Sequence, residues 1–188
     1  MRIGFDLDKI FVDYPPFIPD QLIDRIYKKK SNGELIYRIP TLPEQYLRSF
    51  FHLSIFRPII KENIDVVKKI PRANNQLFLI SSRFSFLEKR TKSILEKYKL
   101  DTLFDDMYFN FEDKQPHIFK NEILKKLHLD IYIDDDLHLL RYIAPYHKKT
   151  QFFWLTSDTD NKDKHSLYNI IPITQLAEIV KYTPYVTR

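Results

Sequence analysis

The chain has 188 residues, of which 44% are hydrophobic and 29% charged, the balance of an ordinary globular domain with a sizeable core. It contains no cysteine, which excludes disulfides and thiolate metal sites, and no apolar run reaches the roughly 20 residues that span a bilayer. The net charge of +5 favours anionic partners, but the basic residues are scattered, so we do not expect nucleic acid as the partner. The N-terminus lacks the pattern of a secretory signal, and we expect a cytoplasmic location.

Short apolar runs alternate with stretches of helical periodicity along the chain. We expect strands over residues 3–7, 76–80, 106–111, 130–133 and 150–155, and helices over 21–29, 59–70, 86–98, 118–127, 137–144 and 173–182. A polar loop over 157–165 separates the last strand from the last helix. Strands that alternate with helices predict an α/β fold that is Rossmann-like, with three α/β/α layers and a mainly parallel sheet.

Residues 14–57 interrupt this alternation. They are rich in proline and aromatic residues, with one expected helix and a turn at residues 31–34. We therefore predict a small, mostly helical cap or lid, inserted after the first strand into a core formed by residues 1–13 and 58–188.

Two acids, Asp6 and Asp8, stand one residue apart where the first apolar run ends. Residues at i and i+2 of a strand point to the same side, so we expect the two carboxylates to face one way and to repel each other. A hard divalent cation with oxygen ligands is the usual relief for such repulsion. This pattern predicts a Mg²⁺ site at the end of the first strand.

Polar residues also stand at the ends of two later strands. Ser81 follows the strand over 76–80, and Asp134 and Asp135 follow the strand over 130–133. The carboxyl ends of parallel strands meet at one edge of an open sheet, where ligands bind. We therefore expect these side chains to gather with Asp6.

The ordered set resembles the haloacid dehalogenase-like (HAD) superfamily of phosphohydrolases. The motifs as they stand here are Phe5-Asp6-Leu7-Asp8, Leu77-Phe78-Leu79-Ile80-Ser81, a lysine on or before a helix (Lys120), and Ile131-Tyr132-Ile133-Asp134-Asp135. Each motif alone is weak, but four of them in this order, each at a strand or helix edge, are specific. The resemblance covers nearly the whole chain outside the insert.

The resemblance implies a role for each of these residues. Asp6 would be the nucleophile that forms an aspartyl-phosphate, and Asp8 would give a proton to the leaving group and then take one from water. Such double duty needs a raised pKa, which we expect from burial and the neighbouring carboxylate. Ser81 would bind a phosphate oxygen, and Lys120 would supply positive charge to the nucleophile.

The same resemblance implies the metal ligands and the substrate contacts. Mg²⁺ would be held by Asp6, the backbone carbonyl of Asp8, Asp134 and Asp135. The next two residues after Ser81, Ser82 and Arg83, are similar to a variant found in nucleotidase-like members and would contact the substrate phosphate. The expected substrate is a small phosphomonoester, with a nucleoside monophosphate as the first candidate.

Several alternatives stay open on sequence alone. Lys114 competes with Lys120 for the role of the motif lysine, and the acids 134–136 also suit the start of the following helix. Lys9 stands where the family usually has glycine, so it either attracts phosphate or marks a degenerate member that binds a phosphorylated ligand or partner without turnover. A nucleic-acid end phosphatase is a further alternative, supported only by the charge. A receiver-type signalling domain fits poorly, because it lacks Asp-x-Asp on its first strand. The sequence does not define the oligomeric state.

Overall fold

The structure is a computed structural model that describes residues 1–16, 28–31, 34–37, 39–157 and 169–183. Its core is a parallel six-stranded sheet with the strand order β5-β4-β1-β6-β7-β8. The strands are β1 (Arg2–Phe5), β4 (Gln76–Ser81), β5 (Asp106–Phe109), β6 (Ile131–Asp134), β7 (Gln151–Leu155) and β8 (Ile170–Ile173). The predicted α/β fold with a parallel sheet is confirmed.

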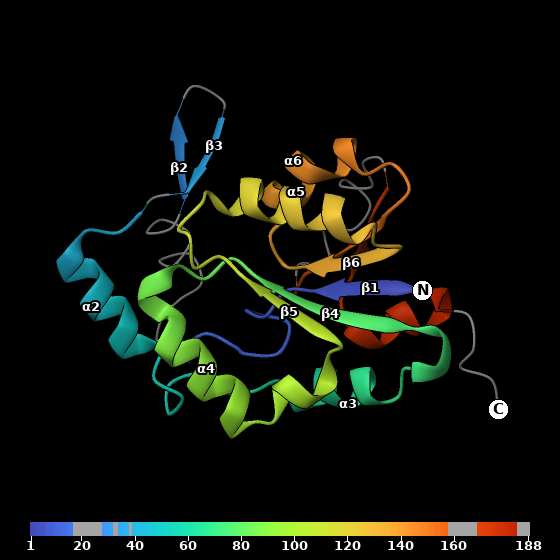
Figure 1. The fold of residues 1–188 in the computed structure, drawn as a ribbon, viewed down its shortest axis with the longest axis horizontal. Coiled ribbons are helices and arrows are strands. Elements are labelled where there is room, and N and C mark those ends of the chain that lie inside the picture. Colours follow the sequence, from blue (N-terminus) through green and yellow to red (C-terminus); the bar gives the residue numbers. More distant parts are fainter. Residues whose placement is uncertain (17–27, 32–33, 38, 158–168, 184–188) are drawn as a thin grey trace.

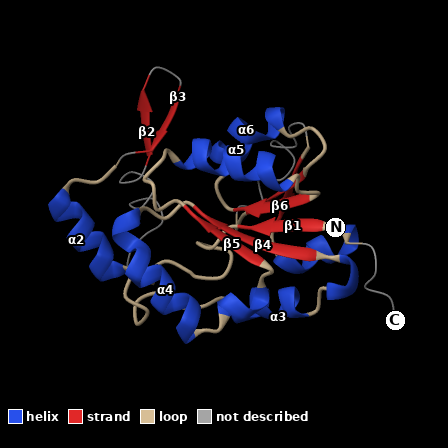
Figure 2. Cartoon of the chain, in the orientation of Figure 1, coloured by secondary structure: helices blue, strands red, loops and turns tan. Residues whose placement is uncertain are grey.

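Helices cover both faces of the sheet, which gives the three expected layers (Figures 1 and 2). One face packs against α5 (Pro116–Leu127) and α6 (Leu137–Ile143). The other packs against α3 (Lys61–Lys68), α4 (Glu88–Lys97) and the 3₁₀ helix η5 (Leu176–Tyr182). Shorter 3₁₀ turns are η1 (Arg72–Asn74), η2 (Ser85–Leu87), η3 (Leu100–Leu103) and η4 (Ala144–Tyr146).

The inner strands β4, β1 and β6 are buried on both faces, as helices on either side of a parallel sheet require. In β4, Leu77 and Leu79 belong to the core on the α3/α4 side, while Phe78 and Ile80 belong to the core on the α5/α6 side. In the central strand β1, Gly4 faces the α5/α6 side, where a Cβ would lie 2.5 Å from Leu129 Cδ1. A residue without a side chain therefore lets this layer pack closely on the middle of the sheet.

Strand β1 lies at the point where the chain changes direction across the sheet. It pairs with β4 on one side and with β6 on the other. From β4 the chain continues outward to β5, and from β6 it continues outward in the opposite direction to β7 and β8. Parallel sheets have a crevice beyond the carboxyl ends of the strands at such a point. Asp6, Ser81 and Asp134 all lie at these strand ends.

The chain between β1 and α3 contains a hairpin as well as a helix. Strands β2 (Lys28–Ser31) and β3 (Glu34–Tyr37) pair antiparallel, and α2 (Leu42–Phe51) follows, with Thr41 and Glu44 forming a capping box at its start. We predicted a mostly helical insert with a helix over 21–29. Residues 21–27 lie outside the described residues, while residues 28 and 29 are in a strand. Of the predicted turn at 31–34, residues 32 and 33 lie outside the described residues, while Ser31 and Glu34 pair across the hairpin.

The hairpin is attached to the core through Tyr37. Its backbone N–H donates to Gln115 Oε1 at 2.9 Å, and Gln115 Nε2 donates back to the Tyr37 carbonyl at 3.1 Å. The Tyr37 hydroxyl donates to Asp136 Oδ2 at 2.7 Å, at the start of α6. The end of β3 is therefore fixed against the edge of the sheet that carries the polar residues.

The C-terminal part differs from the sequence prediction. A sixth strand, β8, occupies residues 170–173, and the predicted helix over 173–182 is a 3₁₀ helix that begins only at Leu176. Pro172 lies within β8, which is an edge strand, where proline is tolerated. The polar loop predicted over 157–165 lies mostly outside the described residues. None of the helices described is both long and apolar enough to cross a membrane.

Candidate active site

Asp6 and Asp8 lie in a turn beyond β1, because the strand ends at Phe5. The backbone N–H of Asp8 donates to Asp6 Oδ2 at 3.1 Å, which holds the turn. The two carboxylates then take different partners. The strand ends at Phe5, but the backbone N–H of Asp6 still donates to the Ile133 carbonyl of β6 at 2.9 Å, and the expectation that the two carboxylates face one way stays a prediction.

Asp6 is buried and bound to a buried lysine from helix α5. Lys120 Nζ donates to Asp6 Oδ1 at 2.8 Å and to Asp134 Oδ2 at 2.6 Å. The hydroxyl of Tyr132 also donates to Asp134 Oδ2, at 2.9 Å. Three buried groups from β1, α5 and β6 thus form one charge-paired cluster. Lys114, the rival for this position, is at the surface and pairs with Glu112 and Glu122.

A third acid completes a group suited to a metal ion. Asp6, Asp134 and Asp135 offer oxygen atoms that all lie within 4.8 Å of one another. Burial raises the pKa of Asp6 to about 7, with Lys120 opposing and Asp134 adding to the rise. Burial and the charge of Asp134 raise the pKa of Asp135 well above its usual range. Holding these carboxylate oxygens close together costs free energy because like charges repel. A hard divalent cation such as Mg²⁺, which prefers oxygen ligands, would offset that repulsion.

The third acid of the run has a different role. Asp136 Oδ1 accepts hydrogen bonds from the backbone N–H groups of His138 and Leu139 at 3.0 and 3.3 Å, and so caps α6. The backbone N–H of Asp136 donates to Asp134 Oδ1 at 3.0 Å. The capping alternative is therefore right for Asp136, while its two predecessors join the cluster with Asp6.

Asp8 is held by two arginines. Arg83 donates from Nε to Asp8 Oδ2 at 2.9 Å and from Nη2 to Oδ1 at 2.7 Å, in a two-point contact. Arg57 Nη2 donates to the same Oδ1. Burial by itself would raise the pKa of Asp8, but Arg83 and then Arg57 hold it well below its usual range. The expected raised pKa is therefore wrong, and of the Asp8 oxygens only the backbone carbonyl remains suited to the metal.

The residues that follow β4 lie close to this pair. Ser81 is buried at the end of the strand, and its Oγ accepts from the backbone N–H of Arg83 at 3.5 Å. The Oγ of Ser82 is buried and makes no hydrogen bond with any of the described residues. Arg83 is buried and points to Asp8 rather than to the surface. This loop therefore presents a hydroxyl beside the acids.

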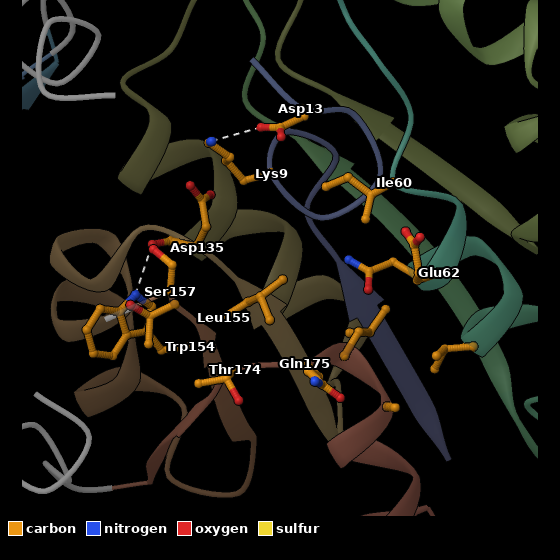
Figure 3. A pocket seen from close by; sticks show the side chains of 15 residues that line it. Lys9, Asp13, Ile60, Glu62, Asp135, Trp154, Leu155, Ser157, Thr174 and Gln175 are labelled. Atoms are coloured by element: carbon orange, nitrogen blue, oxygen red, sulfur yellow. Dashed lines mark hydrogen bonds and ion pairs between the residues drawn. The ribbon is translucent and has the colours of Figure 1, made fainter. Parts of the chain in front are cut away.

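Lys9 adopts a backbone conformation that glycine reaches more easily than other residues. Its φ angle is 60°, in the left-handed region, so the turn forms without a glycine. Lys9 Nζ pairs with Asp13 at 2.8 Å and lies 4.7 Å from the centre of the Tyr14 ring. Figure 3 shows Lys9 and Asp135 at one side of a pocket of about 600 Å³, which extends over the ends of β6, β7 and β8.

Sequence analysis missed two important contacts. Arg57 precedes Pro58 in a stretch rich in aromatic residues, and nothing in its neighbourhood indicates that it reaches Asp8. Tyr132 stands in an apolar run that predicts a buried strand, so nothing in that pattern indicates that its hydroxyl donates to Asp134. A long side chain inside a strand, two residues before an acid, is the weak signal that was available for Tyr132.

No protein-family model matches the chain. No curated protein matches it either. Among solved structures it is similar to a predicted phosphoglycolate phosphatase from Haemophilus somnus, with a TM-score of 0.66, 15% identity and 96% of each chain covered. It is also similar to a HAD-superfamily hydrolase from Ehrlichia chaffeensis, with a TM-score of 0.54, 14% identity, and coverage of 96% of this chain and 94% of that one.

A third similar structure is a D,D-heptose bisphosphate phosphatase from B. bronchiseptica, solved with magnesium and phosphate. Its TM-score is 0.55 at 11% identity, with 97% of each chain covered. Similarity at these identities establishes the fold. The chain therefore has the HAD-like fold over nearly its whole length.

Proposed function

We propose that the protein is a Mg²⁺-dependent phosphatase that hydrolyses a small phosphomonoester through an aspartyl-phosphate on Asp6. The observation that carries the proposal is the buried Asp6–Lys120–Asp134 cluster at the sheet crevice, with Asp135 beside it. A nucleophilic carboxylate, a fixed cation and a set of hard oxygen donors at one strand end are what phosphoryl transfer needs. The HAD-like fold of known phosphatases supports the same reaction class.

The first half of the reaction uses Asp6 and Asp8. An oxygen of Asp6 attacks phosphorus, the bond to the leaving oxygen breaks, and Asp8 delivers a proton to that oxygen. Lys120 stabilises the negative charge that gathers on Asp6 and the transferring group. Asp6, Asp134, Asp135 and the carbonyl of Asp8 would hold Mg²⁺, which neutralises the repulsion between the carboxylate and the phosphate.

The second half regenerates the enzyme. Water attacks the phosphorus of the aspartyl-phosphate, Asp8 accepts a proton from that water, and the bond between phosphorus and Asp6 breaks. The products are inorganic phosphate and the Asp6 carboxylate. Ser81, Ser82 and Arg83 bind the phosphate oxygens in both halves, and the buried Ser82 hydroxyl supports this assignment.

A pocket that Asp135 lines has room for a small substrate, although Asp6 and Ser81 are not among its lining residues. The pocket of about 600 Å³ next to Lys9 and Asp135 falls within the usual size of small-molecule sites. We propose that residues 14–57 form a cap over this edge of the core, since Tyr37 is hydrogen-bonded to Asp136 there. A nucleoside monophosphate stays the first candidate, on the basis of the Ser-Ser-Arg sequence.

A second candidate function is binding of a phosphorylated ligand without turnover. The specific observation in its favour is the contact of both Arg57 and Arg83 with Asp8, which keeps this carboxylate ionised. An acid locked in that state does not protonate a leaving group. In the phosphatase proposal the arriving phosphate shares these guanidinium groups with Asp8, so that Asp8 keeps its orientation and can take up a proton.

The test is phosphate release from 4-nitrophenyl phosphate with Mg²⁺, by the unaltered protein and by Asp6→Asn. We expect turnover that disappears in Asp6→Asn and on addition of EDTA, while the circular dichroism spectrum is retained. Equal turnover by the unaltered protein and Asp6→Asn would rule out Asp6 as the nucleophile. Absence of turnover over a panel of phosphate esters, together with binding of inorganic phosphate, would favour the second function.

A further inference from the structure

Arg57 is a buried arginine at the junction between the insert and the core. Its side chain is 1% exposed, and it is the largest of the fully buried side chains described. It reaches back to Asp8 in the turn after β1, and its guanidinium carbon lies 5.0 Å from the centre of the Tyr14 ring. A guanidinium is costly to bury, so this placement is the result of specific contacts.

One of these contacts is a histidine whose protonation the geometry fixes. His52 Nδ1 lies 2.7 Å from the Arg48 carbonyl and Nε2 lies 3.2 Å from Arg57 Nη1. A carbonyl only accepts and a guanidinium only donates, so Nδ1 carries the proton and Nε2 accepts. Burial and then Arg57 lower the pKa of His52 to about 3, which agrees with a neutral ring. The end of α2 therefore holds Arg57 through His52.

Arg83 holds the other side of the same carboxylate. Its Nη1 donates to Thr91 Oγ1 of α4 at 3.3 Å, while Nε and Nη2 bind Asp8. Asp8 Oδ1 thus accepts from both arginines, one supplied by the junction with the insert and one by the loop after β4. Contacts from two directions leave the carboxylate a single orientation.

We infer that Arg57 is a positioning residue for the hydrolysis of the aspartyl-phosphate, because together with Arg83 it fixes the orientation in which Asp8 meets the attacking water. The inference rests on the proposed function. In this step the water oxygen bonds to phosphorus, its proton passes to Asp8, and the bond from phosphorus to Asp6 breaks. An oriented carboxylate is what that proton transfer needs. With 4-nitrophenyl phosphate the attack by Asp6 does not depend on Arg57, because 4-nitrophenolate leaves without a proton from Asp8.

The distinguishing measurement is pre-steady-state release of 4-nitrophenol from 4-nitrophenyl phosphate, in the whole protein with Mg²⁺. In Arg57→Met we expect a burst close to one equivalent, then a steady state lowered about tenfold or more, with KM not increased. 2,4-Dinitrophenyl phosphate, whose leaving group also departs without a proton from Asp8, should then turn over at the same steady-state rate, because both esters wait on the same intermediate. A merely structural role would produce neither the burst nor the equal rates.

Controls separate this role from loss of an arginine in general. Arg90 donates from Nε to Ser49 Oγ of α2 at 3.4 Å and has no contact with Asp8 among those described, so Arg90→Met should show no burst. Arg57→Lys should recover part of the steady-state rate, because an ammonium still donates to Asp8. If Arg57→Met fails to fold, the same measurement is made on His52→Phe. This change removes the nitrogen atom that accepts from Arg57 and leaves an aromatic ring at position 52.

The possible results test the positioning role of Arg57 separately from the proposed phosphatase function. Turnover without a burst in both Arg57→Met and His52→Phe, or a raised KM with unchanged kcat, overturns the inference and leaves the phosphatase intact. A faster steady state in Arg57→Met also overturns it, because the arginine would then restrain Asp8. Absence of turnover in the unaltered protein overturns the proposed function, and this inference with it.

Discussion

Replacing Lys120 by methionine removes one charge from the buried cluster and keeps the length of the side chain. Lys120 is 3% exposed and lies 2.8 Å from Asp6 and 2.6 Å from Asp134. At an effective dielectric constant of about 20, each attraction amounts to about 6 kcal/mol before desolvation is counted. Measured losses for breaking buried pairs are smaller, about 3–5 kcal/mol, because the desolvation cost of the removed charge is recovered.

The environment of Asp6 places the expected loss at the lower end of that range. Burial already raises the pKa of Asp6 to about 7, so this carboxyl takes up a proton readily when the ammonium is removed. We therefore expect Lys120→Met to lose about 3 kcal/mol in the free energy of unfolding in EDTA. Mg²⁺ at one fixed concentration should stabilise Lys120→Met more than the unaltered protein, because a cation among the acids replaces the missing charge, and each tenfold lower Kd adds about 1.4 kcal/mol.

The assay is urea unfolding followed by the fluorescence of Trp154, the single tryptophan of the chain. Its indole N–H donates to the Asp135 carbonyl at 3.0 Å and the side chain is buried, so its emission reports both unfolding and the state of the site. Lys114→Met is the matched control, because the ion pairs of that lysine are at the surface and should leave the midpoint unchanged. A loss below about 1 kcal/mol in Lys120→Met would refute the buried cluster, and so would a Mg²⁺ effect equal in both variants.

Two further predictions concern the sheet and the histidine of the insert. Gly4→Ala should destabilise the protein by about 1–3 kcal/mol, seen as a lower urea midpoint, because the new methyl group meets Leu129 Cδ1 at 2.5 Å and Tyr132 Cδ2 at 3.0 Å. An unchanged midpoint would contradict the close packing on β1. His52, with its pKa lowered from 6.5 to about 3, takes up its proton first in the unfolded chain, so stability falls as the pH drops below about 6.5. The difference in the free energy of unfolding between the unaltered protein and His52→Phe, measured by urea titration, should therefore become smaller as the pH is lowered below about 6.5. A difference that does not change with pH would contradict a buried neutral ring.

The sequence predicted the core of the fold because its signals are local. Apolar runs of strand length, separated by helical periodicity, identified β1, β4, β5, β6 and β7 to within a few residues. Strand β8 was missed because a short edge strand with Pro172 lacks that pattern. The hairpin β2–β3 was missed because its first residues, Lys28–Lys30, have no alternation of apolar and polar residues.

The cluster of acids was predictable for a different reason. Strand ends of a parallel sheet share one edge, so Asp6, Ser81 and Asp134 could be placed together without knowledge of any contact. The charge state of Asp8 could not be predicted, because it depends on Arg57 and Arg83, which reach it from outside the pattern of strands and helices. Burial of a guanidinium is decided by tertiary packing, and the sequence around it carries no sign of this.

The central position of β1 also has a consequence for how the molecule assembles. The contact between Lys120 and Asp6 joins residues 114 positions apart, and the contact between Arg83 and Asp8 joins residues 75 apart. Closing such long loops is slow and comes after local helices have formed. An incomplete or misassembled chain would hold helices and yet fail to bring the acids together, so affinity for Mg²⁺ would serve as a sensitive measure of the correctly folded fraction in a preparation.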